Sequence, residues 1–430
     1  MIYLYLYLFS CIGLIAFSFF CLADSPWSSP ARLLSVVTLI HGLAIKPIFV
    51  ALSIPSYEFI DDFILSPLTR SDYWQGSLAL QGCYWLFVLA MFFTMHFLKN
   101  LQITRSINKT IYFETGASIA LLIIGLLGFF YFTLENPSLL MGANKNVLAS
   151  DSLDTYSGNG ILRLITSLLS ILPFLMLINI GNKYKIKLSI TIFLSSVISW
   201  ILFGIVSDQR GLIIFSMLVW LVAYNMFVDK LRLKYLLIVL FLAASIVTVK
   251  TAFRLSNDDS GVIESVNDIV GNYIGRNFIE NGKTLIVIDA IPNSLQFSYG
   301  ESYLDSILIL LPRSLFPNKL TVNLDTIIGN SIFGCNSFGA CAVPPGLIAE
   351  SYINFGPIWV ILSVLLCGFL TAWLDWKSSH SSYFFKVFYV SNLVFFGIAA
   401  LGSGIASFIT QTLTCLLVLC PVFYILKRTG

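Results

Sequence analysis

The chain has 430 residues, of which 57% are hydrophobic and 11% are charged, and its mean hydropathy is +0.86. Soluble domains carry roughly 25% charged residues, so this composition excludes a water-soluble globular protein. The net charge is only +3, and the basic residues lie in short connections between apolar stretches. A nucleic-acid partner therefore has no support.

Apolar runs between charged residues predict an all-α, polytopic membrane protein of about 11 transmembrane helices, because each crossing of the bilayer needs about 20 apolar residues. Helices are required because backbone exposed to lipid must satisfy its own hydrogen bonds. The predicted spans lie near residues 2–22, 33–54, 76–98, 115–134, 160–180, 188–206, 212–228, 235–252, 356–374, 383–400 and 405–426. The first stretch lacks a basic n-region, so we interpret it as a retained span.

Basic residues fall in every second connection, which predicts the orientation of the chain. The basic connections hold Lys99, Arg105 and Lys109, then Lys183, Lys185 and Lys187, then Lys230, Arg232 and Lys234. The positive-inside rule places them in the cytoplasm, with the N-terminus outside and the C-terminus inside. Three regions follow: spans one to eight over 1–252, a large outer loop over 253–355, and spans nine to eleven over 356–430.

The large loop mixes polar residues with aromatic and apolar clusters, so we expect it to form short helices against the membrane surface rather than a disordered linker. Cations on the outer side run against the usual bias and could coordinate an anion. They are Arg163, Arg210, Lys250, Arg254, Arg276, Arg313 and Lys319. Arg163 and Lys250 could instead extend to lipid headgroups, and Arg210 could pair with Asp208.

Two segments of this region carry further candidates. In FSYGESYLDSILILLPRSLFPNK, Tyr299 and Tyr303 could stack on sugar rings or belong to an interfacial aromatic belt. Arg313, between two prolines, could hold a phosphate or act as an ordinary interfacial anchor.

In PPGLIAESYINFG, Glu350 and Asn354 would share one face of a helix. Glu350 could be a general base or could pair with an arginine. Cys335 and Cys341 could close a disulfide that stiffens their loop. The sequence shows no spacing typical of metal ligands.

These two segments, the turn SDQRGLII and the late large loop resemble the O-antigen (oligosaccharide repeat-unit) polymerases of the Wzy type. The likeness covers mainly residues 205 to 360. It implies a GT-C-like membrane fold and a glycosyltransferase of the bacterial inner membrane, acting on its periplasmic face in lipopolysaccharide biosynthesis. The substrates would be undecaprenyl-diphosphate-linked oligosaccharides, with no metal or cofactor, and a chain-length regulator is a candidate partner.

In this interpretation, diphosphate would be bound by the cations Arg210, Arg254, Arg276, Arg313 and Lys319. Tyr299, Tyr303 and Asn354 would bind sugar, and Glu350 would act as the base, with Arg210 also catalytic. Three rival functions remain open. They are an O-antigen ligase, a lipid-linked oligosaccharide flippase or transporter, and a structural scaffold for polysaccharide assembly.

Overall fold

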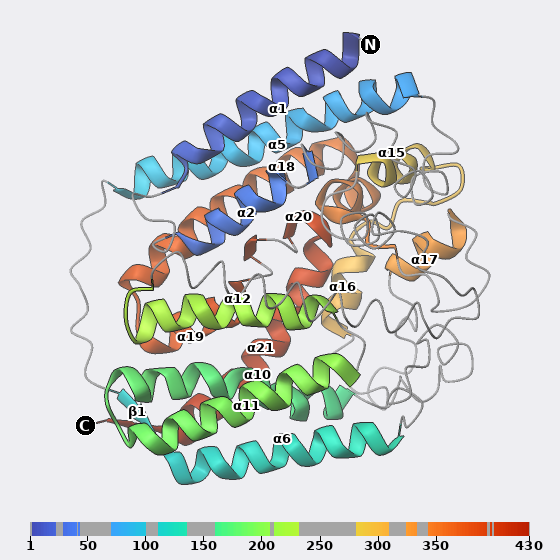
Figure 1. The fold of residues 1–430 in the computed structure, drawn as a ribbon. Helices are drawn as coiled ribbons and strands as arrows, with labels where there is room; N and C mark the ends of the chain where they lie inside the picture. Colours follow the sequence, from blue (N-terminus) through green and yellow to red (C-terminus); the bar gives the residue numbers. More distant parts are fainter. Residues whose placement is uncertain are drawn as a thin grey trace, which may run out of the picture. The chain divides into compact units, whose positions relative to one another are not determined.

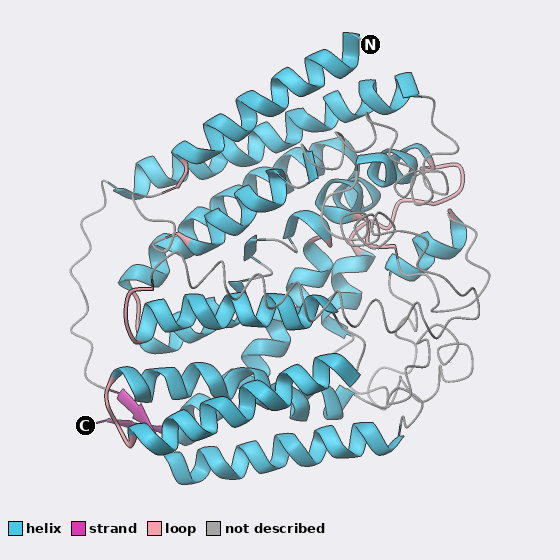
Figure 2. Cartoon of the chain, in the orientation of Figure 1, coloured by secondary structure: helices cyan, strands magenta, loops and turns pink. Residues whose placement is uncertain are grey.

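The computed structural model describes most of the chain, and the described part is mostly helical (Figure 2). The described residues are 2–22, 29–40, 42–43, 70–99, 111–135, 160–206, 210–231, 281–308, 324–332, 343–393, 396–397 and 400–429. Five helices in these ranges are long and apolar enough to cross a membrane. They lie at Ile2–Phe20, Asp72–Lys99, Ile186–Gly204, Gly346–His380 and Ile405–Leu426. The protein is therefore consistent with an all-α membrane protein.

Only five described helices are long and apolar enough to cross a membrane, so the count of about 11 spans and the GT-C-like fold stay predictions. The described helices that overlap predicted spans are not all of that length. They are α1 (Ile2–Phe20), α2 (Pro30–Ile40), α5 (Arg70–Lys99), α6 (Thr115–Glu135), α10 (Gly160–Gly181), α11 (Ile186–Val206), α12 (Arg210–Phe227), α18 (Gly346–His380), α19 (Tyr383–Ser391), α20 (Ala400–Gly402) and α21 (Ile405–Leu426). The predicted span near 235–252 lies outside the described residues. The segment predicted to be the large loop contains three short helices, α15 (Asn281–Asp289), α16 (Glu301–Leu308) and α17 (Leu324–Ser331), and their position against the membrane surface stays a prediction.

The chain divides into two compact units, each built from separated segments of sequence. Unit 1 contains Met1–Thr104, Glu264–Ser379 and Val394–Gln411, and unit 2 contains Arg105–Ile263, His380–Leu393 and Thr412–Gly430. Each unit contains residues from all three regions predicted from the sequence. The two units defined by contacts in the structure therefore differ from those three regions.

In unit 1, α1 and α5 pack along each other (Figure 1). Trp85 of α5 approaches Phe17 of α1, with ring centroids 5.9 Å apart, and its indole N–H donates to the Ser10 hydroxyl at 3.1 Å. The opposite face of α1 is exposed and apolar, with Phe9 79% exposed. An exposed apolar helix face of this kind suits lipid as the surrounding solvent.

Helix α18 is broken into two arms near its start. Phe355 and Gly356 have non-helical backbone angles, and Gly356 has a φ of 74°. Pro357 follows, and proline favours the first position of a helix because it has no N–H to leave unpaired. The sequence Gly-Pro therefore ends one short arm and begins the long apolar arm.

In unit 2, several connections between helices meet at one end. The strand β1 (Ile111–Phe113) pairs antiparallel with β2 (Lys427–Thr429) beside the C-terminus. Asn179 near the end of α10 exchanges two hydrogen bonds with the backbone of Phe113, at 2.7 and 2.8 Å. These bonds satisfy the open edge of the strand, which would otherwise expose unpaired backbone groups.

The turn between α10 and α11 lies at the same end. Tyr184 in that turn stacks on Tyr112 of β1 with ring centroids 4.3 Å apart. Gly181 lies so close to the carbonyl oxygen of Phe227, at the end of α12, that a Cβ there would collide with it. The sequence predicts that these connections and the C-terminus all face the cytoplasm, and their shared location in unit 2 is compatible with that register.

Candidate functional site

The turn before α16 lies against the short first arm of α18, within unit 1. The N–H of Ser298 donates to the carbonyl of Ile353 at 2.9 Å, and the N–H of Gly300 donates to Asn354 Oδ1 at 3.0 Å. The second contact joins residues 54 positions apart in the sequence. The two motif segments that the sequence singled out therefore meet in the folded chain, and we call this region the kink site.

Asn354 holds the kink site together from inside. Its side chain is 0% exposed, and its Nδ2 group donates to the Ser302 hydroxyl and to the Glu350 carbonyl, both at 2.8 Å. Each polar atom of the amide thus has a partner within the protein. In this geometry Asn354 positions the turn, and its predicted contact with sugar stays a prediction.

Tyr299 protrudes from the turn in a conformation that a non-glycine residue rarely adopts. Its φ is 46°, and its side chain is 76% exposed. Residues held in such sparsely populated regions cluster at functional sites, where the surrounding structure over-determines them. The next residue, Gly300, has a φ of 91°, and a Cβ there would lie 2.9 Å from the Phe355 ring. Close packing on α18 thus fixes Tyr299 in its exposed position.

Further aromatic rings lie around Tyr299. Phe297 lies with its ring centroid 6.1 Å from that of Tyr299, and Phe355 is 47% exposed at the break in α18. Phe355 also packs edge to face on Trp359, at 5.3 Å between centroids. The exposed rings Tyr299 and Phe355 offer flat apolar faces beside the start of a candidate membrane span.

Tyr303 has a different role from Tyr299. Its hydroxyl oxygen accepts a hydrogen bond from the indole N–H of Trp359 at 3.0 Å. Burial raises the pKa of Tyr303 to about 12, and the nearby Glu350 carboxylate adds to the rise. The phenol therefore stays protonated at physiological pH and ties α16 to the long arm of α18.

Glu350, on the first arm of α18, is 1% exposed. One carboxylate oxygen accepts the N–H of Ala406 at 3.0 Å, and the other accepts the N–H of Ile405. These N–H groups belong to the first turn of α21, where a helix has unpaired donors and a partial positive charge. The preceding residue, Gly404, has a φ of 99°, and a Cβ there would collide with the carboxylate. Glu350 thus caps α21.

The side chains of the cations predicted to bind diphosphate lie outside the described residues. Arg210 is the first residue of α12, but its side chain lies outside the described residues. The same holds for all of Arg254, Arg276, Arg313, Lys319, Cys335 and Cys341. Their roles stay predictions. Within the described ranges, no three His, Cys, Asp or Glu side chains lie close enough to hold a metal ion.

Sequence reasoning missed the aromatic residues Phe297, Phe355 and Trp359. The pair Gly356–Pro357 could have indicated Phe355 and Trp359. This pair marks a helix boundary and so exposes the aromatic residues beside it. Phe297 becomes relevant only because the turn folds back onto α18.

The fold and the kink site define a helical membrane protein that presents an aromatic turn at the start of a broken span. Comparison with protein-family models, curated proteins and solved structures gives no match for this chain.

Proposed function

We propose that this protein is an O-antigen polymerase. In this role it is a glycosyltransferase that joins undecaprenyl-diphosphate-linked oligosaccharide repeat units on the periplasmic face of the bacterial inner membrane. The proposal begins from the resemblance of three segments, described above, and from the membrane character of the chain.

The observation that carries the proposal is the contact between two of those segments. The turn with Tyr299 and the arm with Asn354 are hydrogen-bonded at the kink site, although the sequence separates them. Dispersion between an aromatic face and the apolar face of a sugar ring favours stacking of the two. A lipid-linked oligosaccharide carries its sugars immediately above the bilayer, so aromatic residues at the start of a span are well placed to receive them.

The reaction requires stabilisation of a departing lipid diphosphate. Arginine suits this role because its planar guanidinium donates two parallel hydrogen bonds and remains charged. We assign it to Arg210, Arg254, Arg276 and Arg313, assisted by Lys319. Cations fixed before the reaction stabilise the developing charge more than the ground state, which lowers the barrier.

The acceptor hydroxyl must also lose a proton, and Glu350 is the predicted base. In the described structure both of its oxygens are engaged by backbone N–H groups of α21. A catalytic Glu350 would therefore have to exchange at least one of these bonds for the acceptor hydroxyl.

A deletion strain tests the function directly. We expect its lipopolysaccharide to carry a single repeat unit in place of a ladder, as seen by gel electrophoresis, and a plasmid copy to restore the ladder. A normal ladder in the deletion strain would exclude a polymerase, whereas bare core without any repeat unit would indicate a ligase.

The same strain tests the kink site. We expect Tyr299→Ala to shorten the ladder, with about 5- to 10-fold lower polymerisation, because an aromatic contact contributes about 1 kcal/mol beyond its buried area. Tyr5→Ala on α1 is the matched control, since Tyr5 is also exposed, at 63%, but lies outside the kink site. Equal ladders for the two variants, at equal protein levels, would remove Tyr299 from the site.

A further inference from the structure

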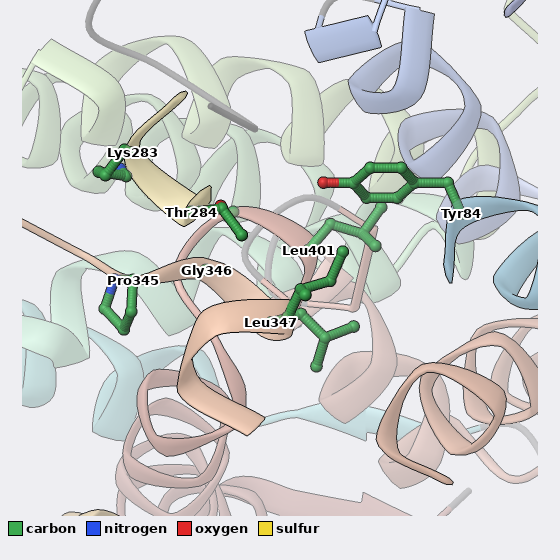
Figure 3. A pocket seen from close by; sticks show the side chains of 9 residues that line it. Tyr84, Lys283, Thr284, Pro345, Gly346, Leu347 and Leu401 are labelled. Carbon is green, nitrogen blue, oxygen red and sulfur yellow. The ribbon is translucent and has the colours of Figure 1, made fainter. Parts of the chain in front are cut away.

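A pocket in unit 1 is too small to enclose a phosphate group or a sugar. Tyr84 of α5, Thr284 of α15 and Leu347 of α18 are among the residues that line it (Figure 3). Its volume is about 10 Å³, which is the space of about one water molecule. An exposed, positively charged surface of unit 2 is the stronger candidate for a ligand site.

The turn between α10 and α11 holds two exposed lysines in a conformation that non-glycine residues rarely adopt. Lys183 has a φ of 57° and Lys185 a φ of 38°. The turn is tied to β1, because Asn182 Nδ2 donates to the Ile111 carbonyl at 2.6 Å. Backbone strain of this kind persists only where the surrounding structure over-determines it. The fold therefore presents both lysines at fixed places on the surface.

Cations from the C-terminal strand lie near this turn. Tyr184 in the turn stacks on Tyr112 of β1, and Tyr112 is opposite Arg428 in the two-stranded sheet. Lys427 precedes Arg428 in β2. Figure 1 shows β1 and the C-terminus beside one end of α10 and α11. Basic residues that are far apart in the sequence are therefore neighbours at this end of unit 2.

The end of α12 adds a further cation. Gly181, at the end of α10, lies against the Phe227 carbonyl of α12. Lys230 follows Phe227 by three residues and is exposed. Its own N–H donates to Asp229 Oδ1 at 2.7 Å. The connection after α12 therefore meets the turn between α10 and α11.

Few acids accompany these cations in the described segments. Glu114, after β1, pairs with Arg428 at 2.5 Å between Oε2 and Nη2. The turn of residues 182–187 carries three lysines and no acid. Six cations therefore stand with two acids, Glu114 and Asp229, an excess of four positive charges. We call the six cations the basic patch: Lys183, Lys185, Lys187, Lys230, Lys427 and Arg428.

The basic patch borders an exposed apolar face. Helix α11 is a candidate membrane span that begins at Ile186, and both Ile186 and Leu188 are exposed on either side of Lys187. Tyr424, near the end of the candidate span α21, is exposed as well. Long cationic side chains at the ends of spans extend to lipid headgroups, and tyrosines are enriched at the same level. The patch is thus placed at the level of lipid phosphates.

We infer that the basic patch binds the headgroups of anionic phospholipids. The ammonium groups of Lys183 and Lys185 donate to phosphate oxygens, in a cluster of cations at the ends of spans that suits an anionic lipid surface. The fixed turn holds these cations in place before lipid binds, so less conformational entropy is lost on binding. An acidic protein segment would meet the same charges, but it would not account for the apolar face beside them. The inference does not depend on the proposed function.

The test uses the purified full-length chain in a nonionic detergent and measures its thermal unfolding midpoint as lipid is added. We expect a saturable rise with phosphatidylglycerol, which weakens as salt is raised, and a smaller rise with zwitterionic phosphatidylcholine. Lys183→Gln combined with Lys185→Gln should weaken the apparent affinity for phosphatidylglycerol at least about 10-fold, since each cation near an anionic lipid surface contributes to binding.

The matched control is Lys99→Gln combined with Lys377→Gln. It also removes two lysines, from the candidate spans α5 and α18 of unit 1, outside the basic patch. This control should bind phosphatidylglycerol as the unsubstituted protein does. Lys187→Gln combined with Lys427→Gln tests the patch without changing the strained turn, so the inference stays testable if the first pair does not fold.

Three results would overturn the inference. They are equal shifts with the two lipids, an equal loss of affinity in the control pair, and an affinity for phosphatidylglycerol that survives both pairs of patch substitutions. Glycerol phosphate and polyglutamate, added at the same concentration of charge, distinguish other ligands. A shift with either that matches phosphatidylglycerol would assign the patch to free phosphate or to an acidic protein instead of lipid.

Discussion

At the residue scale, the role of Glu350 depends on what its carboxyl group contacts in the folded chain. The sequence places it beside a span, where a general base or an ion pair are both reasonable interpretations. The structure surrounds it with the first turn of α21 and with Gly404, whose conformation leaves no room for a Cβ. The two carboxyl oxygens accept backbone N–H groups that the first turn of a helix would otherwise leave unpaired.

The substitution Glu350→Gln separates capping from catalysis. Glutamine has a single acceptor oxygen and no charge, so one N–H of α21 is left unpaired in a buried position. We expect the free energy of unfolding to fall by about 2 kcal/mol, since leaving a buried hydrogen-bond donor unpaired costs about 1 to 3 kcal/mol. The measurement is thermal or denaturant unfolding of the purified protein. The control is Glu301→Gln, because Glu301 is exposed at the start of α16 and should change stability little.

A stable Glu350→Gln variant without activity would favour a catalytic role for Glu350. If Glu350→Gln unfolds as the unsubstituted protein does, yet the cells make no ladder, the carboxylate acts as the base and the capping role is minor.

At the scale of elements, α18 holds other helices through side chains at both of its ends. Glu350 near its start accepts N–H groups of α21, and Asp375 near its end accepts the N–H groups of Ala31 and Arg32, at 3.0 and 3.1 Å, in the first turn of α2. Arg32 also donates its Nε to Asp375 at 2.9 Å, in a pair whose side chains are 8% and 0% exposed. A single helix therefore fixes the starts of two others within unit 1.

Breaking this buried pair should be costly. We expect Arg32→Met to lower the unfolding free energy by about 3 to 5 kcal/mol, because it leaves an uncompensated buried carboxylate. The comparison is Glu114→Gln in unit 2, which breaks a pair with Arg428 whose side chains are 50% and 44% exposed. Exposed pairs contribute about 0 to 1 kcal/mol, so this variant should be nearly neutral. Equal destabilisation by the two substitutions, measured by denaturant unfolding, would contradict the role of α18.

At the scale of the whole molecule, each unit shows a consistent sidedness. In unit 1, Arg32 contacts the Cys21 carbonyl beyond the end of α1, whereas Asn281 of the large loop contacts Tyr7 near its beginning. Fourteen helical residues span roughly 20 Å, so these contacts lie at opposite ends of α1. In unit 2, the basic connections share one end with the C-terminus. Within each unit, taken by itself, the ends of the helices are therefore distinct, and the side of a membrane that each end faces stays a prediction.

Labelling with a membrane-impermeant maleimide tests this sidedness in intact cells. We expect Glu301→Cys, on α16 of the large loop, to react from outside, and Lys185→Cys, in the turn before α11, to react only after the membrane is opened. The unsubstituted protein gives the background from native thiols. The orientation is wrong if Lys185→Cys reacts in intact cells and Glu301→Cys does not. That result would also remove the kink site from the periplasmic face.

The sequence by itself determined the helical, apolar character of the chain and the places of its five long apolar helices. Run length and apolar composition act locally, and a helix in lipid satisfies its own backbone, so the helices of the described spans follow from nearby residues alone. The short helices of the large loop were predicted on a different basis, the mixture of polar residues with aromatic and apolar clusters. The sequence also marked Tyr299, Tyr303, Glu350 and Asn354 as polar or aromatic residues with chemical potential.

Only the tertiary structure decided what these residues contact. Asn354 accepts a hydrogen bond from Gly300 across 54 positions, and Glu350 caps α21 across 56. None of these pairings has a local signal, because hydrogen-bond partners at such separations are chosen by how helices pack rather than by the pattern within any one of them. Packing within unit 1 therefore turned a set of candidate residues into a kink site and a helix cap.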